Sequence, residues 1–218
     1  MNEQNKNDIK EILANLSRED YEKDVDLHLH TCCSDGKLTP EQILADAKKK
    51  GYRLIAISDH NTIEAHKNQN ITDSSMVLKA VEFDCWYKGV LVHILGYGMD
   101  ITNQDFLNLC AKTKKETEAD IVRFFNSRKP KDVIEAVHKA GGVAILAHPA
   151  CYWAINLDKF IKSLVDIGLD GVEAFYLYRR HRGIIKFHKA ETVEKIGRKY
   201  NLLLTGGSDS HREIEPIV

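Results

Sequence analysis

The chain has 218 residues, of which 43% are hydrophobic and 29% charged, as in ordinary globular proteins. Its 31 basic and 32 acidic side chains nearly cancel, so no global field recruits nucleic acid or an anionic membrane. No stretch approaches the roughly 20 apolar residues of a membrane span, and the polar N-terminus lacks a signal-peptide core. The five cysteines lack Cys-x-x-Cys spacing, which favours reduced thiols. We expect one cytoplasmic domain, residues 1–218.

Strand-like and helix-like hydropathy patterns alternate along the chain, and this alternation indicates a parallel α/β sheet or barrel. We expect strands at 24–28, 53–58, 76–87, 90–97, 143–147, 171–175 and 202–205. We expect helices at 7–17, 40–50, 62–67, 103–127, 130–140, 157–167 and 184–200. The segment 99–140 carries highly charged helices, so we expect it to be an insertion that caps the domain and does not build its core.

Histidines and acidic residues gather at the C-terminal ends of these strands, or just past them. The segment "VDLHLH" (25–30) is typical, because His28 and His30 share one strand face and are followed by a loop. A TIM-type barrel collects its active site at this end of its strands. The candidate residues are His28, His30, Asp35, His60, Glu82, His93, His148, Asp209 and His211.

Isolated histidines and aspartates at strand ends are usually structural, but this set of six imidazoles and three carboxylates is not isolated. Burying so many titratable groups on one rim without compensation would be costly. Divalent cations remove that cost, because they bind neutral imidazole and ionised carboxylate. His28 and His30 can both reach one ion at about 2.1 Å. Nine candidates exceed what one tetrahedral ion uses, so we expect a cluster of ions with a bridging carboxylate.

Six segments in register carry a resemblance to a known family. They are "DLHLHTCCSDG", "IAISDHNT", "VEFD", "HILGYG", "GGVAILAHP" and "GSDSH". In this order they resemble the polymerase and histidinol phosphatase (PHP) family of metal-dependent phosphoesterases, from about Val25 to His211. The resemblance implies a distorted (β/α)7 TIM-like barrel with a small helical insertion. It also implies a trinuclear site with two to three divalent transition metal ions, usually manganese, iron or zinc.

The resemblance further implies how the ligands divide among the ions. A first ion would be held by His28, His30, Glu82 and Asp209. A second would be held by Glu82, acting as a bridge, with His93 and His148. A third would be held by Asp35, His60 and His211. All nine positions hold the expected residue type, and Glu82 and Asp209 are expected to be catalytic.

The chain departs from the family where substrate phosphate is expected to bind. Relatives often carry a basic residue shortly after the "AHP" motif, and "AHPACYW" (147–153) has none. We expect the arginines of "LYRRHRG" to replace it: Arg179, Arg180 and Arg182. His181 lies in the same loop, where it would act as a catalytic acid on the leaving group. A solvated basic turn and a plain surface histidine are the alternatives.

The expected function is hydrolysis of a small phosphoester, of nucleotide or sugar phosphate type, by a metal-bridging hydroxide that attacks phosphorus in line. The cations would also neutralise charge on the phosphoryl oxygens. The lack of a long accessory domain favours a small phosphoester over duplex DNA, so we expect no stable nucleic-acid partner. We also expect no membrane partner. The alternatives are a nuclease on short oligonucleotide ends, hydrolysis of a non-phosphate bond, and a non-catalytic metal-binding module.

Overall fold

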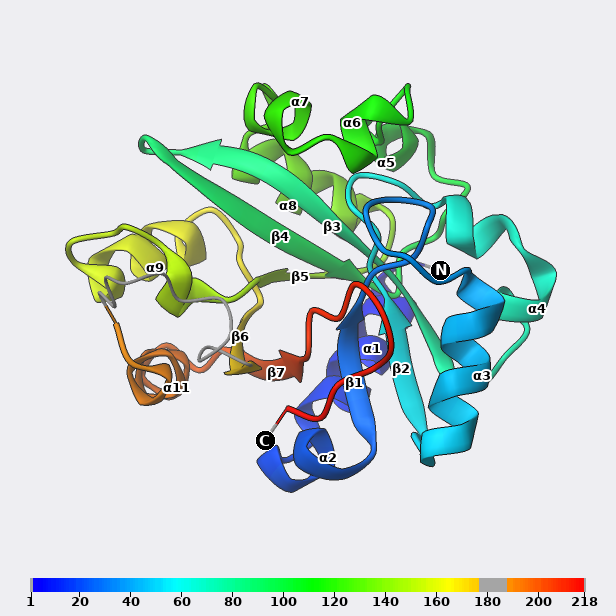
Figure 1. Cartoon of the computed structure of the whole chain (residues 1–218). Helices are drawn as coiled ribbons and strands as arrows, with labels where there is room; N and C mark the ends of the chain where they lie inside the picture. Colours follow the sequence, from blue (N-terminus) through cyan, green and yellow to red (C-terminus); the bar gives the residue numbers. More distant parts are fainter. Residues whose placement is uncertain (1, 177–187, 218) are drawn as a thin grey trace.

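In the computed structural model, which describes residues 2–176 and 188–217, seven strands form one sheet in the order β1-β2-β3-β4-β5-β6-β7. The sheet curls until β1 meets β7, where a bridge joins Leu29 to Ser210, and the result is a nearly closed barrel (Figure 1). The strands are β1 (Val25–Leu29), β2 (Leu54–Ile57), β3 (Val77–Tyr87), β4 (Val90–Tyr97), β5 (Val143–Leu146), β6 (Gly171–Tyr176) and β7 (Leu203–Gly207). The predicted seven-stranded TIM-like barrel is confirmed.

The barrel is distorted because β4 runs against both of its neighbours, while the remaining pairs are parallel. β3 returns directly into β4 through Lys88 and Gly89, whose φ angles are 50° and 78°. Two successive positive φ angles are typical of the tight turns that join antiparallel strands. No helix therefore separates β3 from β4, and the regular β/α alternation is broken here.

Helices surround the barrel on its outer side (Figure 1). The described helices are α1 (Asn2–Ala14), α2 (Arg18–Lys23), α3 (Pro40–Lys50), α4 (Gln69–Thr72), α5 (Gln104–Leu109), α6 (Lys115–Glu118), α7 (Asp120–Phe124), α8 (Pro130–Lys139), α9 (Leu157–Val165) and α11 (Ala190–Lys199). Their ends follow local chemistry. α3, for example, begins where the Thr39 side chain accepts a hydrogen bond from Gln42 N, and it ends at Gly51 in a left-handed conformation.

The insertion differs from its sequence prediction in two ways. The helix expected at 103–127 is three short helices, α5 to α7, because the charged run between them offers no continuous apolar face and Ala119 is extended. α8 does not cap the domain as expected of 99–140, because Val133, Ile134 and Val137 are fully buried in the core. In Figure 1, α6 and α7 lie at the top of the view, above the β3–β4 hairpin.

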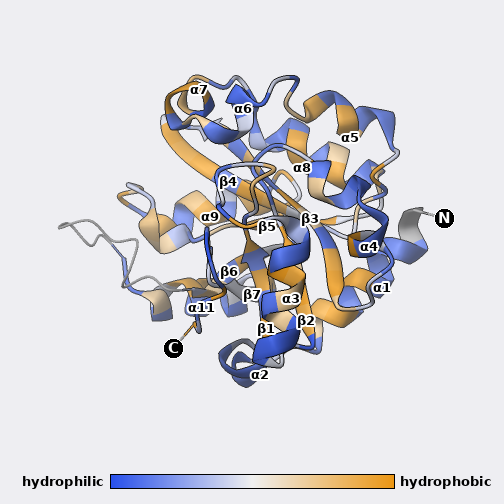
Figure 2. Ribbon diagram, turned by 45° about the vertical axis from the view of Figure 1, so that its right-hand side comes forward, coloured by the Kyte–Doolittle hydropathy of each residue, from blue (hydrophilic) through white to orange (hydrophobic). Residues whose placement is uncertain are grey.

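The core lies in the barrel and between the barrel and its helices. Figure 2 shows the strands mostly in orange and much of the helix surface in blue. Leu27, Phe83, Ile94, Ile145 and Val172, one from each of five strands, are fully buried in a single apolar cluster. This cluster fixes the strands that carry the polar residues described below.

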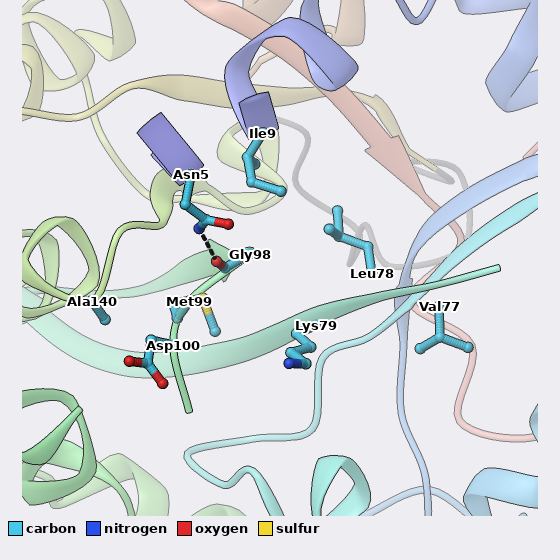
Figure 3. A pocket seen from close by; sticks show the side chains of 9 residues that line it. All are labelled: Asn5, Ile9, Val77, Leu78, Lys79, Gly98, Met99, Asp100 and Ala140. Atoms are coloured by element: carbon cyan, nitrogen blue, oxygen red, sulfur yellow. Dashed lines mark hydrogen bonds between the residues drawn. The ribbon is translucent and has the colours of Figure 1, made fainter. Parts of the chain in front are cut away.

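α1 covers the end of the barrel where the parallel strands begin. Asn5 Nδ2 donates hydrogen bonds of 2.8 Å to the carbonyls of Gly98 and Gly141. A pocket of about 440 Å³ lies beside this contact, between α1 and the start of β3 (Figure 3). Lys79 and Asp100 are the charged residues that line it, so it lacks the cluster of titratable groups found at the opposite end of the barrel.

Candidate metal centre

The nine sequence-predicted ligands converge at one end of the barrel. They come from six of the seven strands or from the turns that follow them, so the ends of distant segments meet in space. The possible ligand atoms form four overlapping groups, and within each group all of these atoms lie within 4.8 Å of one another. Together the groups contain His28, His30, Asp35, His60, Glu82, Asp84, His93, His148, Asp209 and His211. All nine expected residues are in this set, and Asp84 was not expected.

The histidine–carboxylate distances in the group predicted for a first ion match those between ligands of one tetrahedral ion. Ligands at about 2.1 Å from one tetrahedral ion lie about 3.4 Å from each other. His28 Nε2 is 3.3 Å from Glu82 Oε2 and 3.6 Å from Asp209 Oδ1. The corresponding distances from His30 Nε2 are 3.3 and 3.1 Å. His28, His30 and Asp209 therefore form one group that could hold a cation, and Glu82 Oε2 lies beside both histidines.

The other carboxylate oxygen of Glu82 faces a second group. Glu82 Oε1 lies 2.9 Å from His93 Nδ1 and 3.2 Å from His148 Nε2. The two oxygens of one carboxylate thus point to different sets of histidines, as a bridging ligand requires. The geometry fits the bridging role that we predict for Glu82.

Asp35 gathers the third predicted group. Asp35 Oδ1 lies 3.2 Å from His211 Nε2, and Asp35 Oδ2 lies 3.6 Å from His60 Nε2. His30 Nδ1 is 3.7 Å from Asp35 Oδ1, on the ring edge opposite its contacts with Glu82 and Asp209. The ring of His30 thus lies between the first and third groups.

The fit to metal ions is supported by buried nitrogen atoms that lack partners. His28 Nε2, both ring nitrogens of His30 and His60 Nδ1 are buried and make no hydrogen bond within residues 2–176 and 188–217. Leaving a buried polar group unsatisfied costs about 1–3 kcal/mol. A cation would give each of these atoms a partner, and a mixed set of imidazole and carboxylate ligands suits manganese, iron or zinc.

The charges of the clustered side chains show what cations would replace. Burial raises the pKa of Glu82, but His28 and His93 outweigh this effect and hold the pKa well below its usual range. Burial lowers the pKa of His30, but Asp209 and Glu82 raise it to about 10. Protons on histidines therefore balance ionised carboxylates here. Metal binding releases such protons, because the ligand is neutral imidazole.

Glu173, in the middle of β6, is a site residue that sequence reasoning missed. Its Oε1 lies 2.9 Å from His28 Nδ1, and its Oε2 accepts a 2.8 Å hydrogen bond from His148 N. A carboxylate bonded to one ring nitrogen of a histidine directs the other nitrogen at a metal. The sequence signal is a single acidic residue inside the buried strand "GVEAFY", away from the strand ends where the predicted ligands lie.

Three further side chains at the centre were not predicted. Asp84 lies two residues after Glu82 on the same strand face, the spacing that identified His28 and His30. Arg123 reaches in from α7, where its Nη1 donates to Asp35 Oδ2 at 2.7 Å. Tyr176 Oη donates to Asp209 Oδ2 at 2.8 Å. The spacing could have identified Asp84, whereas Arg123 had no periodic pattern to single it out.

Asp59 orders the loop between His30 and Asp35. It accepts hydrogen bonds from Thr31 N at 2.7 Å, Thr31 Oγ1 at 2.6 Å and Ser34 Oγ at 2.6 Å. The predicted substrate-binding and acid residues Arg179, Arg180, His181 and Arg182 fall in 177–187, outside the described residues. Their roles stay predictions.

A nearly closed α/β barrel whose strand ends collect histidines and carboxylates that could hold several metal ions is the arrangement of a metal-dependent hydrolase. Within that class, the family model "PHP domain" matches residues 26–164, and the chain belongs to this family. It is a PHP-family metal-dependent phosphoesterase. None of the helices in the described ranges is long and apolar enough to cross a membrane.

Two curated relatives act on different phosphodiesters. The phosphoribosyl 1,2-cyclic phosphate 1,2-diphosphodiesterase of Eggerthella lenta is 24% identical, over 85% of this chain and 93% of that enzyme. The 5'-3' exoribonuclease Rnm of Escherichia coli is 34% identical, over 70% of this chain. The chain matches only 52% of the length of that exoribonuclease. The substrate type is therefore not fixed by these relatives.

Solved structures agree in fold. The putative metal-dependent phosphoesterase from Bifidobacterium adolescentis superposes with a TM-score of 0.67 at 24% identity. The similarity covers 89% of this chain and 90% of that one. An amidohydrolase from Chromobacterium violaceum superposes with a TM-score of 0.69 at 18% identity, over 89% and 93% of the two chains. These similarities support the fold alone.

Proposed function

We propose that the chain hydrolyses a small phosphoester, of nucleotide or sugar phosphate type, at this metal centre. The observation that carries the proposal is the placement of Glu82, whose two oxygens face two separate groups of histidines. When bound, divalent ions supply charge to the phosphoryl oxygens and lower the pKa of a coordinated water toward neutrality. The relatives named above both act on phosphodiesters, which supports phosphoester chemistry.

The protein's contribution is to hold ligands in place before substrate arrives. Tyr176 Oη occupies one oxygen of Asp209 and leaves the other facing His28 and His30. Glu173 fixes the ring of His28 in the same way. Preorganised charges of this kind need little rearrangement during the reaction, which lowers its barrier.

Arg123 adds a positive charge beside the centre. Its side chain is 11% exposed, and it comes from the insertion, not from the loop in which we expected the phosphate-binding arginines. A guanidinium can pair with two oxygens of a phosphate at once. We therefore propose that Arg123 contacts an anionic group of the substrate, alone or together with the arginines of 179–182.

A nuclease that acts on short oligonucleotide ends is the second candidate. The 34% identity to an exoribonuclease supports it. The chain matches about half of that enzyme's length, whereas it matches nearly all of the cyclic phosphate diesterase. The match to the cyclic phosphate diesterase over nearly its whole length supports the small substrate.

An activity screen separates these functions. Manganese-loaded protein is assayed on nucleotides, sugar phosphates, a cyclic ribose phosphate and short 5'-phosphorylated oligoribonucleotides, with Glu82→Gln as the inactive control. Turnover of small phosphoesters at least tenfold faster than that of oligonucleotides supports the leading proposal. Faster release of mononucleotides from oligonucleotides supports the nuclease. A fully metal-loaded chain without turnover on any substrate would make it a metal-binding module.

A further inference from the structure

Asn61 follows the predicted ligand His60 and makes hydrogen bonds to two separate parts of the chain. It is fully buried and has a φ of 56°, a left-handed conformation that asparagine tolerates better than most residues. Its backbone N donates to Glu82 O at 2.8 Å. Its Oδ1 accepts from Asp84 N at 3.0 Å, and its Nδ2 donates to Asp84 Oδ2. Asn61 is thereby fixed to β3, the strand that carries Glu82.

The remaining hydrogen bonds of Asn61 go to the insertion. Its carbonyl accepts from Ala111 N at 2.7 Å, and its Nδ2 also donates to Glu116 O at 3.2 Å. The side-chain oxygen and both side-chain N–H groups of this asparagine are therefore used. Nearby, Thr117 Oγ1 donates to Cys33 O at 3.4 Å. Asn61 thus joins β3 to the segment around α6 through two of these three contacts.

Apolar packing contributes little to the position of the segment that carries Arg123. None of the described residues of α7 is buried. α6 and α7 have four and five residues and are too short to be stable alone. At the far end of the segment, Trp86 bonds to Phe124 O and Arg128 O. Hydrogen bonds at the two ends therefore decide where Arg123, between them, is held.

We propose that Asn61 is a positioning residue that locks the insertion over the metal centre and thereby places Arg123 beside Asp35. Without the Asn61 side chain, Glu116 O loses its partner, and the backbone contact with Ala111 is what remains at the near end. Arg123 is then held less firmly in the position from which it would pair with an anion. Substrate binding weakens as a result, while the nine predicted ligands keep their places.

Asn61→Gly in the manganese-loaded protein tests this role. Glycine adopts the same φ freely, so the backbone bonds to Glu82 and Ala111 can remain when the side-chain bonds are lost. We expect hydrogen exchange, followed by mass spectrometry, to become about tenfold faster across 111–124 and to stay unchanged across α8. Asn201→Gly, at an exposed asparagine with a φ of 53°, is the matched control and should leave exchange in the insertion unchanged.

Steady-state kinetics connect the loosened insertion to Arg123. KM for a small phosphoester should rise about tenfold in Asn61→Gly, with kcat little changed. In the double variant with Arg123→Ala, KM should be no higher than in Arg123→Ala alone, because Asn61 acts through Arg123. Fully additive effects on KM would overturn this step. The manganese content of Asn61→Gly should equal that of the wild type, and a loss of manganese would show that Asn61 supports the ligands and not the insertion.

Unchanged exchange across 111–124 in Asn61→Gly would overturn the inference. If the variant does not fold, the wild type decides by nuclear magnetic resonance. The Ala111 amide should then be among the slowest to exchange in the insertion, and rapid exchange of this amide contradicts the proposal. The link to Arg123 rests on the proposed function, but the exchange measurement uses no substrate. Wild type without turnover therefore contradicts only the proposed function, whereas equal exchange of the two proteins contradicts only the inference about Asn61.

Discussion

At the scale of single residues, the Glu173 carboxylate makes hydrogen bonds to two predicted ligand residues. One carboxylate contacts the ring of His28 on β1 and the backbone of His148 after β5. His148 has a φ of 29°, a conformation that non-glycine residues rarely adopt and that surrounding contacts must maintain. Glu173 therefore fixes both the ring orientation of one predicted ligand and the strained backbone of another.

Glu173→Gln should weaken metal binding while the fold persists. Glutamine cannot accept through both polar atoms, so either His28 or His148 loses its partner. Loss of such a partner typically weakens metal affinity about 10–100-fold. Calorimetric titration of manganese into the metal-free variant measures the change. Glu191→Gln, on the exposed start of α11, is the matched control. Affinity equal to that of the wild type would show that Glu173 does not position the ligands.

The site residues predicted from the sequence all lie at the ends of apolar strands or just past them, and the site residues that were missed do not share this placement. His28, His60 and His148 stand at or just past the ends of apolar runs, where a polar side chain is conspicuous. Glu173 lies within a buried strand, where the apolar pattern suggests packing only. A contact that only folding creates leaves no local pattern in the sequence. Glu173 and His28, for example, are 145 positions apart.

At the scale of elements, the short helices of the insertion are held by tertiary contacts and not by their own sequence. Trp86 Nε1 donates to Phe124 O at 2.7 Å, and Trp86 N donates to Arg128 O at 3.0 Å. Helices of four to six residues are too short to be stable alone. The charged run has no continuous apolar face to hold one long helix, and these contacts with the β3–β4 hairpin hold the segment around Phe124 and Arg128 in place.

Arg123→Ala should raise KM for a small phosphoester about 10–100-fold, because a hydrogen bond to a charged group contributes about 1.5–3 kcal/mol. Arg123→Lys keeps the charge but loses the planar fork, so it should recover only part of the loss. Steady-state kinetics with parallel metal analysis measure both. Lys114→Ala, exposed on the same insertion, is the control.

Variants of the loop that carries the predicted arginines test the alternative, in which this loop and not Arg123 binds the substrate anion. Replacing Arg179, Arg180 and Arg182 by alanine should raise KM with unchanged metal content if this loop binds the substrate anion. A strong effect of that triple variant, combined with no effect of Arg123→Ala, would assign anion recognition to the loop and remove Arg123 from the proposal.

Asp170, at the start of β6, forms ion pairs with side chains of α1 and α8. Its carboxylate lies 2.9 Å from Lys10 Nζ and 2.6 Å from His138 Nε2. It also accepts a 2.9 Å hydrogen bond from Ala144 N. Burial raises the pKa of Asp170, but His138, Ala144 and Lys10 outweigh this effect and lower the pKa to about 2.

The pKa of Asp170 predicts a pH-dependent loss of stability. Because its folded pKa lies below its unfolded value of about 3.9, the stabilisation is complete above about pH 4 and disappears as the pH falls toward 2. Asp170→Asn should lower the free energy of unfolding by about 2 kcal/mol at pH 7, and this deficit should shrink toward pH 2. Urea unfolding at both pH values measures it. Asp105→Asn, an exposed partner of Lys139, should change stability little at either pH.

At the scale of the whole molecule, the predicted ligands cross the seam of the barrel. β1 and β7 are joined by the bridge of Leu29 to Ser210 and by the 3.0 Å bond from His30 N to Ser210 O. His28 and His30 lie on one side of this seam, and Asp209 lies on the other. A cation shared by these side chains would link the first strand to the last.

Metal removal should therefore destabilise the entire fold. At a free metal concentration about 100 times Kd, each bound ion stabilises the folded chain by about 2.7 kcal/mol, which corresponds to about 5–10 °C in Tm. Differential scanning calorimetry with manganese and with a chelator measures the difference. For Glu82→Gln, the difference in Tm between the two conditions should be much smaller. Identical Tm values with and without metal would contradict binding across the seam.

The reversed strand β4 has a consequence for which part of the chain can vary. The ladder pairs Asp84 with His93, which fixes the histidine near the beginning of β4, while the hairpin tip at Lys88 and Gly89 continues beyond them. Residues added at that tip would leave the pairing of Asp84 with His93 unchanged. The length of this one turn can therefore vary while the geometry of the predicted ligands stays intact.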